Sequence, residues 1–193
     1  MIEIRIHGRG GQGNVAAANL VARAAFEEGQ YGQAFPNFGA ERRGAPVMAF
    51  ARIADNPIKR RCQVLAPAFL IIQDQALLYV PGVLDGLLPG GGILVNSTLS
   101  SEELSNQFGK PMIALRAAAL AREVLGRPVP NTALISAFLA LTNILKIESL
   151  GKAVASQFKG KTVVIEKNLQ LLQRAAEQVP AGLWKEISRV KAA

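Results

Sequence analysis

The stretch GRGGQGNVAAANL at residues 8–20 follows the alternating run IEIRIH at residues 2–7. Apolar residues at every second position predict a strand, and the glycines that interrupt the alternation predict a tight turn. We expect a helix over residues 13–28 that ends at Gly29, because glycine is common just after a helix. A strand, a glycine loop and a helix in this order are typical of nucleotide-binding α/β domains.

The rest of the chain continues to alternate between strand and helix patterns. We expect strands over residues 31–34, 47–53, 69–73, 93–95 and 112–115, and helical segments over 75–80, 102–108, 117–125, 131–145, 148–158 and 164–179. The residues from Ile58 onward could pair back as a hairpin after the turn at residues 55–57. The pattern predicts an α/β fold: a single Rossmann-like domain over residues 1–193, with a mostly parallel, doubly wound sheet and a helical C-terminal tail.

The composition of the chain limits the kinds of partner that it can bind. The net charge is +8, but the basic residues are scattered and have no interleaved aromatic residues, so we expect no nucleic acid partner. A mean hydropathy of +0.22 is consistent with a large interface with other subunits, or simply with an alanine-rich core. We expect no signal peptide and no membrane-spanning segment, and therefore a cytoplasmic protein without a membrane partner.

Cysteine and histidine occur once each, which excludes a disulfide and any cysteine cluster for zinc or iron–sulfur. We expect Cys62 to be a small core residue and His7 to be a hydrogen-bonded structural residue, although His7 could touch a ligand. No metal site and no catalytic residue is predicted in this chain.

The first candidate binding site is the glycine loop, which comprises Gly8, Arg9, Gly10, Gly11, Gln12 and Gly13. Its glycines let the backbone approach an anion, and the following helix N-terminus favours phosphate. Arg9 could add a charged contact. The acidic residue that binds ribose in NAD sites is missing about 20 residues further on. A stand-alone NAD-binding protein and a loop that binds nothing both stay open as alternatives.

The second candidate is the stretch FGAERRGAPVMAFARI at residues 38–53, which contains Glu41, Arg42, Arg43 and Gly44. The predicted loop at residues 36–46 is longer than most connections, and such loops are often functional. Two adjacent arginines suit capture of phosphate or carboxylate. Glu41 could equally pair with one of them and hold the loop in place.

These motifs together resemble the gamma subunit of the 2-oxoacid:ferredoxin oxidoreductases, above all the pyruvate and branched-chain types. The resemblance rests on GRGGQG after the first strand and on FGAERRGAPV before a strand and an Asp-Asn-Pro-Ile turn. It continues through GGGILVNS at residues 90–97 to Asn131 at the start of a helix, and so covers about residues 2–145. Ala68 departs from the pattern, since many relatives have Asp there.

The resemblance implies a non-autonomous subunit of an enzyme that oxidatively decarboxylates a 2-oxoacid (pyruvate, a branched-chain 2-oxoacid or an aryl glyoxylate) to the acyl-CoA. The implied partners are alpha, beta and ferredoxin-like delta subunits, with ferredoxin or an NAD-linked acceptor reached through them. Thiamine diphosphate, Mg²⁺ and iron–sulfur clusters would be held by these partners, and this chain alone would bind no cofactor.

Coenzyme A would be a co-substrate at the subunit interface. We expect the glycine loop and the loop of Arg42 and Arg43 to contact coenzyme A, or to face the thiamine site across the subunit boundary. The competing interpretation is that both loops only form the interface with the alpha subunit.

Overall fold

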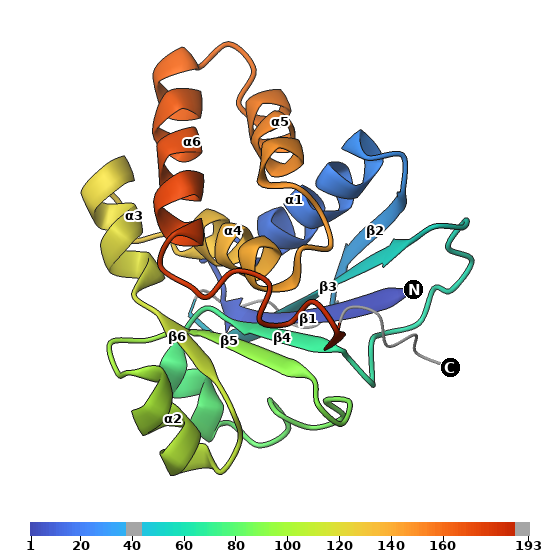
Figure 1. Ribbon diagram of the computed structural model, residues 1–193, viewed down its shortest axis with the longest axis vertical. Coiled ribbons are helices and arrows are strands. Elements are labelled where there is room, and N and C mark those ends of the chain that lie inside the picture. Colours follow the sequence, from blue (N-terminus) through green and yellow to red (C-terminus); the bar gives the residue numbers. More distant parts are fainter. Residues whose placement is uncertain (38–43, 188–193) are drawn as a thin grey trace.

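The computed structural model describes residues 1–37 and 44–187 (Figure 1). Six strands form one sheet in the order β2-β3-β1-β4-β5-β6. The strands are β1 (Ile2–Arg9), β2 (Tyr31–Pro36), β3 (Pro46–Ala54), β4 (Phe69–Ile72), β5 (Gly92–Asn96) and β6 (Ile113–Leu115). Strands β1, β4, β5 and β6 are parallel, whereas β3 is antiparallel to both of its neighbours, β1 and β2. The predicted α/β class with a mostly parallel sheet is confirmed.

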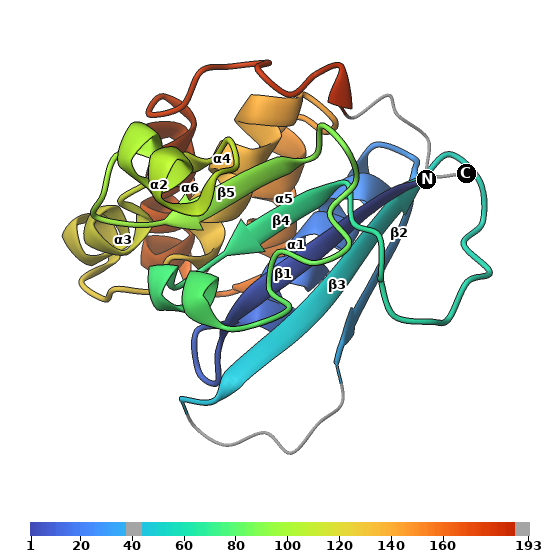
Figure 2. The ribbon, with the colours of Figure 1, turned by 90° about the horizontal axis from the view of Figure 1, so that it is seen from below.

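Helices cover both faces of this sheet (Figures 1 and 2). The helices are α1 (Asn14–Glu27), the 3-10 helix η1 (Gln75–Tyr79), α2 (Ser101–Phe108), α3 (Ala117–Leu125), α4 (Asn131–Thr142), α5 (Ile147–Gln157) and α6 (Thr162–Ala176). Helices α1 and α3–α6 share one apolar core with the sheet, and η1 and α2 share a second core on its other face. Helix α4 is buried at every position after Asn131, which explains why its sequence is apolar almost all round.

The connection between β3 and β4 differs from expectation. Residues 55–68 contain no strand, so the hairpin predicted from Ile58 is wrong. Strand β3 already pairs with β1 on one side and β2 on the other, and it therefore has no free edge for a further strand. Cys62 lies in this connection and is exposed, so its predicted place in the core is also wrong.

The helices within residues 1–37 and 44–187 are too short or too polar to cross a lipid bilayer.

Candidate functional site

The glycine loop leaves the carboxyl end of β1, the third strand of the sheet order and one of its central strands. Gly11 and Gly13 have φ angles of 95° and 80°, a left-handed conformation that glycine adopts without steric cost. The Gln12 amide donates to the Arg9 carbonyl at 3.0 Å, and the Gln12 side-chain oxygen accepts from the Arg9 amide at 2.7 Å. The predicted tight turn is therefore formed by its backbone and is fastened by Gln12.

The N-terminus of α1 directly follows this loop. Gly13 is the N-cap residue, and no side chain caps the helix. A Cβ added to Gly11 would meet no atom of the described residues within 4 Å. The amide groups of a first helical turn have no partner within the helix, and the helix dipole makes this end positive. The loop is therefore suited to an anion.

The side-chain amides of Asn14 and Gln73 form hydrogen bonds that support the loop. A Cβ on Gly8 would overlap the Asn14 side chain, which explains the glycine at this position. Asn14 donates through Nδ2 to the Val47 carbonyl at 3.3 Å and accepts through Oδ1 from Gln73 Nε2 at 2.5 Å. These contacts tie together the ends of β1, β3 and β4. The Gln73 Oε1 atom is buried without a protein partner, an acceptor that a water or ligand donor could satisfy.

Arg9 spans the point at which the chain switches from one face of the sheet to the other. Its Nε lies 2.5 Å from Asp74 Oδ2, and its Nη1 donates to the Gly44 carbonyl at 3.2 Å. Asp74 follows β4 and uses its other oxygen to cap η1, by accepting from the Ala76 amide at 2.9 Å. Arg9 is thus bound to Asp74 and Gly44 at the carboxyl ends of β1 and β4, the end of the sheet at which open α/β proteins bind ligands.

Of the second candidate stretch, the described residues Gly44 and Ala45 lie next to the glycine loop. The Gly10 amide donates to the Ala45 carbonyl at 3.0 Å, and the Gly44 amide to the Gly10 carbonyl at 3.4 Å. Gly44 is therefore in direct contact with Gly10 of the loop. Glu41, Arg42 and Arg43 lie outside the described residues, and their role stays a prediction.

Sequence reasoning missed a row of polar side chains on β1. Glu3, Arg5 and His7 are buried on the strand face opposite the isoleucines. Arg5 donates through Nε to His7 Nε2 at 2.9 Å, and through Nη2 to the Val83 and Asp85 carbonyls at 2.9 and 2.6 Å. Burial, assisted by the charge of Arg5, lowers the pKa of His7 to about 3. His7 is therefore neutral at physiological pH and does not transfer protons there; it supports the strand, as expected.

The described residues of the site offer backbone donors for an anion, and their one carboxylate, Asp74, is already paired with Arg9. No cluster of three or more His, Cys, Asp and Glu side chains occurs in the described part of the chain. The described residues at the end of β2 also include no acidic side chain of the kind that binds ribose in NAD sites. Strand β3 separates β2 from β1, and the residue after β2 is Asn37, which accepts a hydrogen bond from Gln63.

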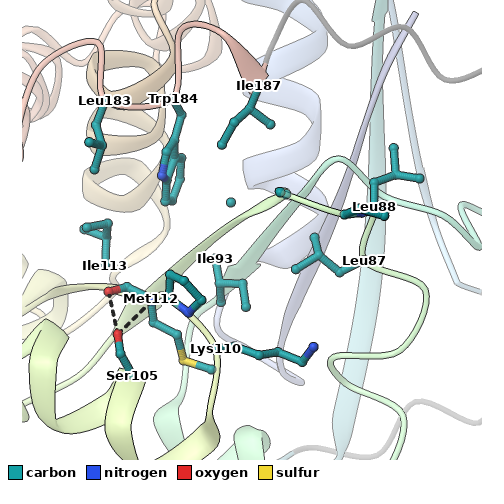
Figure 3. A pocket seen from close by; sticks show the side chains of 15 residues that line it. Leu87, Leu88, Ile93, Ser105, Lys110, Met112, Ile113, Leu183, Trp184 and Ile187 are labelled. Atoms are coloured by element: carbon teal, nitrogen blue, oxygen red, sulfur yellow. Dashed lines mark hydrogen bonds between the residues drawn. The ribbon is translucent and has the colours of Figure 1, made fainter.

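The largest described cavity, of about 620 Å³, lies at the opposite edge of the sheet (Figure 3). Gly92 at the start of β5, Trp184 and Met112 line it, and Lys110 is the one charged residue among its lining. Ser105 in its wall is already engaged, since it donates to the Ser101 carbonyl and accepts from the Met112 amide. Because its lining is mostly apolar, this cavity does not suit a phosphate. The glycine loop therefore remains the candidate anion site.

The sequence of this chain is similar to those of several known proteins. A family model described as pyruvate ferredoxin/flavodoxin oxidoreductase matches residues 3–178. Pyruvate synthase subunit PorC of Methanocaldococcus jannaschii is 46% identical over 179 residues, which cover 93% of this chain and 97% of that protein. The common gamma subunit of the pyruvate/ketoisovalerate oxidoreductases of Thermococcus kodakarensis is 45% identical over 91% of this chain and 95% of its own length.

Solved structures agree with this match. The crystal structure of pyruvate oxidoreductase subunit PORC from Thermotoga maritima superimposes with a TM-score of 0.81 at 35% identity, covering 91% of this chain and 95% of that one. A 2-oxoglutarate:ferredoxin oxidoreductase from Magnetococcus marinus shares the fold, with a TM-score of 0.72 at 19% identity. That match covers 100% of this chain and 32% of the larger one.

Proposed function

We propose that this chain, which belongs to the pyruvate ferredoxin/flavodoxin oxidoreductase family as a gamma-type subunit of a 2-oxoacid:ferredoxin oxidoreductase, binds the diphosphate of coenzyme A with its glycine loop. The family resemblance seen in the sequence is confirmed, and the alternative of a stand-alone NAD-binding protein loses its support. The observation that carries the proposal is the uncapped N-terminus of α1 above an open glycine loop.

The chemistry of coenzyme A fits the donors at this site. Its diphosphate needs backbone amides and a positive field, which the loop and the first turn of α1 supply. Arg9 lies beside the loop, where Asp74 and the Gly44 carbonyl fix its guanidinium. A preformed cradle of this kind would hold the diphosphate and orient the thiol end of coenzyme A toward a partner subunit.

The other cofactors of such a complex do not fit this chain. Thiamine diphosphate needs a Mg²⁺ site, and an iron–sulfur cluster needs several cysteines. The sequence has one cysteine, and the described residues contain no cluster of metal-binding side chains. We therefore propose that alpha, beta and ferredoxin-like delta subunits hold these groups. Pyruvate is the first candidate substrate and a branched-chain 2-oxoacid the second, because the relatives are named for pyruvate and ketoisovalerate.

The test is the KM for coenzyme A of the complete complex. We expect Gly11→Ala to raise this KM about tenfold, the equivalent of about 1.4 kcal/mol, because the added methyl group stands over the loop. Gly109→Ala is the matched control, since Gly109 also has a positive φ and open space around it but ends α2. Arg43→Ala should raise the same KM if the predicted arginine contact is made.

The competing interpretation predicts a different result. If the two loops only contact the alpha subunit, the variants would lower the yield of assembled complex, and the complex that does assemble would keep its KM for coenzyme A. That result would contradict the proposal.

A further inference from the structure

The largest described cavity lies at the start of β5 and β6, away from the glycine loop at the end of β1 (Figure 3). Trp184 and Ile187, from the segment that follows α6, lie on one side of the cavity, and Lys110 and Met112 lie on the other. Its volume of about 620 Å³ is in the range of pockets that bind small molecules. The cavity is therefore a candidate ligand site that is separate from the proposed site for coenzyme A.

The wall that Trp184 forms is held in place by contacts within the chain. The Trp184 amide donates to the Leu141 carbonyl at 2.7 Å, which ties this segment to the end of α4. The indole is 7% exposed and stacks on Phe69, with the ring centres 5.8 Å apart. A Cβ on Gly92 would lie 2.8 Å from the indole, so a glycine is needed at the start of β5 for the ring to pack there. A ligand therefore meets an ordered wall, and little side-chain freedom is lost on binding.

The cavity combines a large apolar surface with one positive charge. Ser105 and Lys110 are the two polar side chains of the described lining, which contains no aspartate or glutamate. Ser105 is already engaged with the Ser101 carbonyl and the Met112 amide. Lys110 is exposed at the rim and forms no ion pair within residues 1–37 and 44–187. The ammonium group of Lys110 is therefore available to a ligand.

We propose that this cavity binds an aliphatic monocarboxylate. The hydrocarbon chain of the ligand packs against Trp184 and the neighbouring leucine and isoleucine side chains, and its carboxylate lies at the ammonium group of Lys110. Transfer of the hydrocarbon chain out of water favours binding. One negative charge matches the one cation of the lining, whereas a phosphate monoester carries nearly two negative charges at neutral pH.

The fluorescence of Trp184 reports directly on this cavity, because the chain contains one tryptophan. The probes are hexanoate, octanoate and decanoate, titrated into the purified full-length chain, with octanol as the uncharged analogue of octanoate. We expect one saturable change in fluorescence. The Kd of the acids should fall about fourfold with each added CH2 group, because each group leaves water on binding.

Lys110→Gln tests the contact with the carboxylate. We expect this variant to raise the Kd of octanoate about fivefold and to leave that of octanol unchanged, because an ion pair at an exposed rim makes a modest contribution. Lys152→Gln is the matched control, since Lys152 is an exposed lysine on α5 outside the lining, and neither Kd should change. Ile113→Phe narrows the cavity and should weaken both ligands, with urea unfolding showing that the variant is folded.

Three results would overturn the inference: no saturable change with any of the acids, an equal effect of Lys110→Gln on octanoate and octanol, or unchanged binding by folded Ile113→Phe. Binding of octanoate to the assembled complex, measured by equilibrium dialysis, tests whether a partner subunit fills the cavity instead. If the full-length chain alone binds octanoate and the complex does not, the cavity is part of a subunit interface, and the proposed ligand site is wrong.

Discussion

His7 lies one residue before the glycine loop, but its imidazole stays neutral and transfers no proton near neutral pH. The ring is 4% exposed, and its Nε2 accepts from Arg5 Nε at 2.9 Å. A cation beside a buried imidazole opposes protonation, so both burial and Arg5 lower the pKa of His7, to about 3. The neutral ring is thus part of the strand's support.

This pKa shift predicts how stability depends on pH. An unfolded histidine takes up a proton near pH 6.5, whereas the folded protein resists protonation of His7 down to about pH 3. The free energy of unfolding should therefore fall by about 1.4 kcal/mol per pH unit as the pH drops below 6.5. The sequence has one histidine, so urea unfolding between pH 6.5 and 5 isolates its effect. His7→Gln should flatten this slope, and equal slopes in both proteins would contradict the explanation.

Sequence alone could predict some of these residues and not others. The spacing of Gly8, Gly10 and Gly13 predicted the turn, because a tight strand-to-helix connection needs glycine, and Gly13 does have a positive φ. The alternation in β1 also predicted a strand. It could not show that the polar face is buried, because the partners of Arg5 are carbonyl groups about 80 residues further along the chain.

At the scale of the elements, Arg52 on β3 holds the long connection over residues 55–68 against the sheet. Its guanidinium is fully buried and donates to Glu3 Oε1 at 2.7 Å, to Gln33 Oε1 at 2.8 Å and to the Cys62 carbonyl at 2.6 Å. It also lies 5.1 Å from the centre of the Phe35 ring. One side chain therefore joins three strands to a connection that has no regular structure of its own.

Replacing Arg52 tests this arrangement. Arg52→Met should lower the free energy of unfolding by about 3 kcal/mol, because the buried Glu3 would keep only its longer ion pair with Arg60, at 3.8 Å. The double variant Glu3→Gln/Arg52→Met should recover part of that loss in a urea titration. Trypsin should also cleave the basic run at residues 59–61 faster in Arg52→Met. The exposed neighbour Arg61→Met is the control, expected within 0.5 kcal/mol of the unchanged chain. If Arg52→Met were as stable as the unchanged chain, Arg52 would not hold the connection against the sheet.

For the molecule as a whole, the strand and helix pattern predicted the α/β class and the mostly parallel sheet, but not where β3 inserts. Strand order depends on pairings between β1 and β3, which run from Ile2 with Ile53 to Arg9 with Pro46 and so join residues far apart in the sequence. A cavity of about 210 Å³ at the N-terminus of α4 was equally unpredictable, because its walls come from α1, α3, α4, α5 and α6. Local patterns determine elements, whereas sites built from several elements depend on how those elements pack.

The relatives of this chain predict assembly with other subunits, because they are named as subunits of oxidoreductases. A tag on this chain should therefore recover a brown complex of several subunits that contains thiamine. With a viologen acceptor it should oxidise one 2-oxoacid in preference to others, in a coenzyme A-dependent reaction, with pyruvate, branched-chain and aryl 2-oxoacids compared. A colourless protein that recovers only copies of itself would contradict the assembly, and the glycine loop would then need testing as an independent nucleotide site.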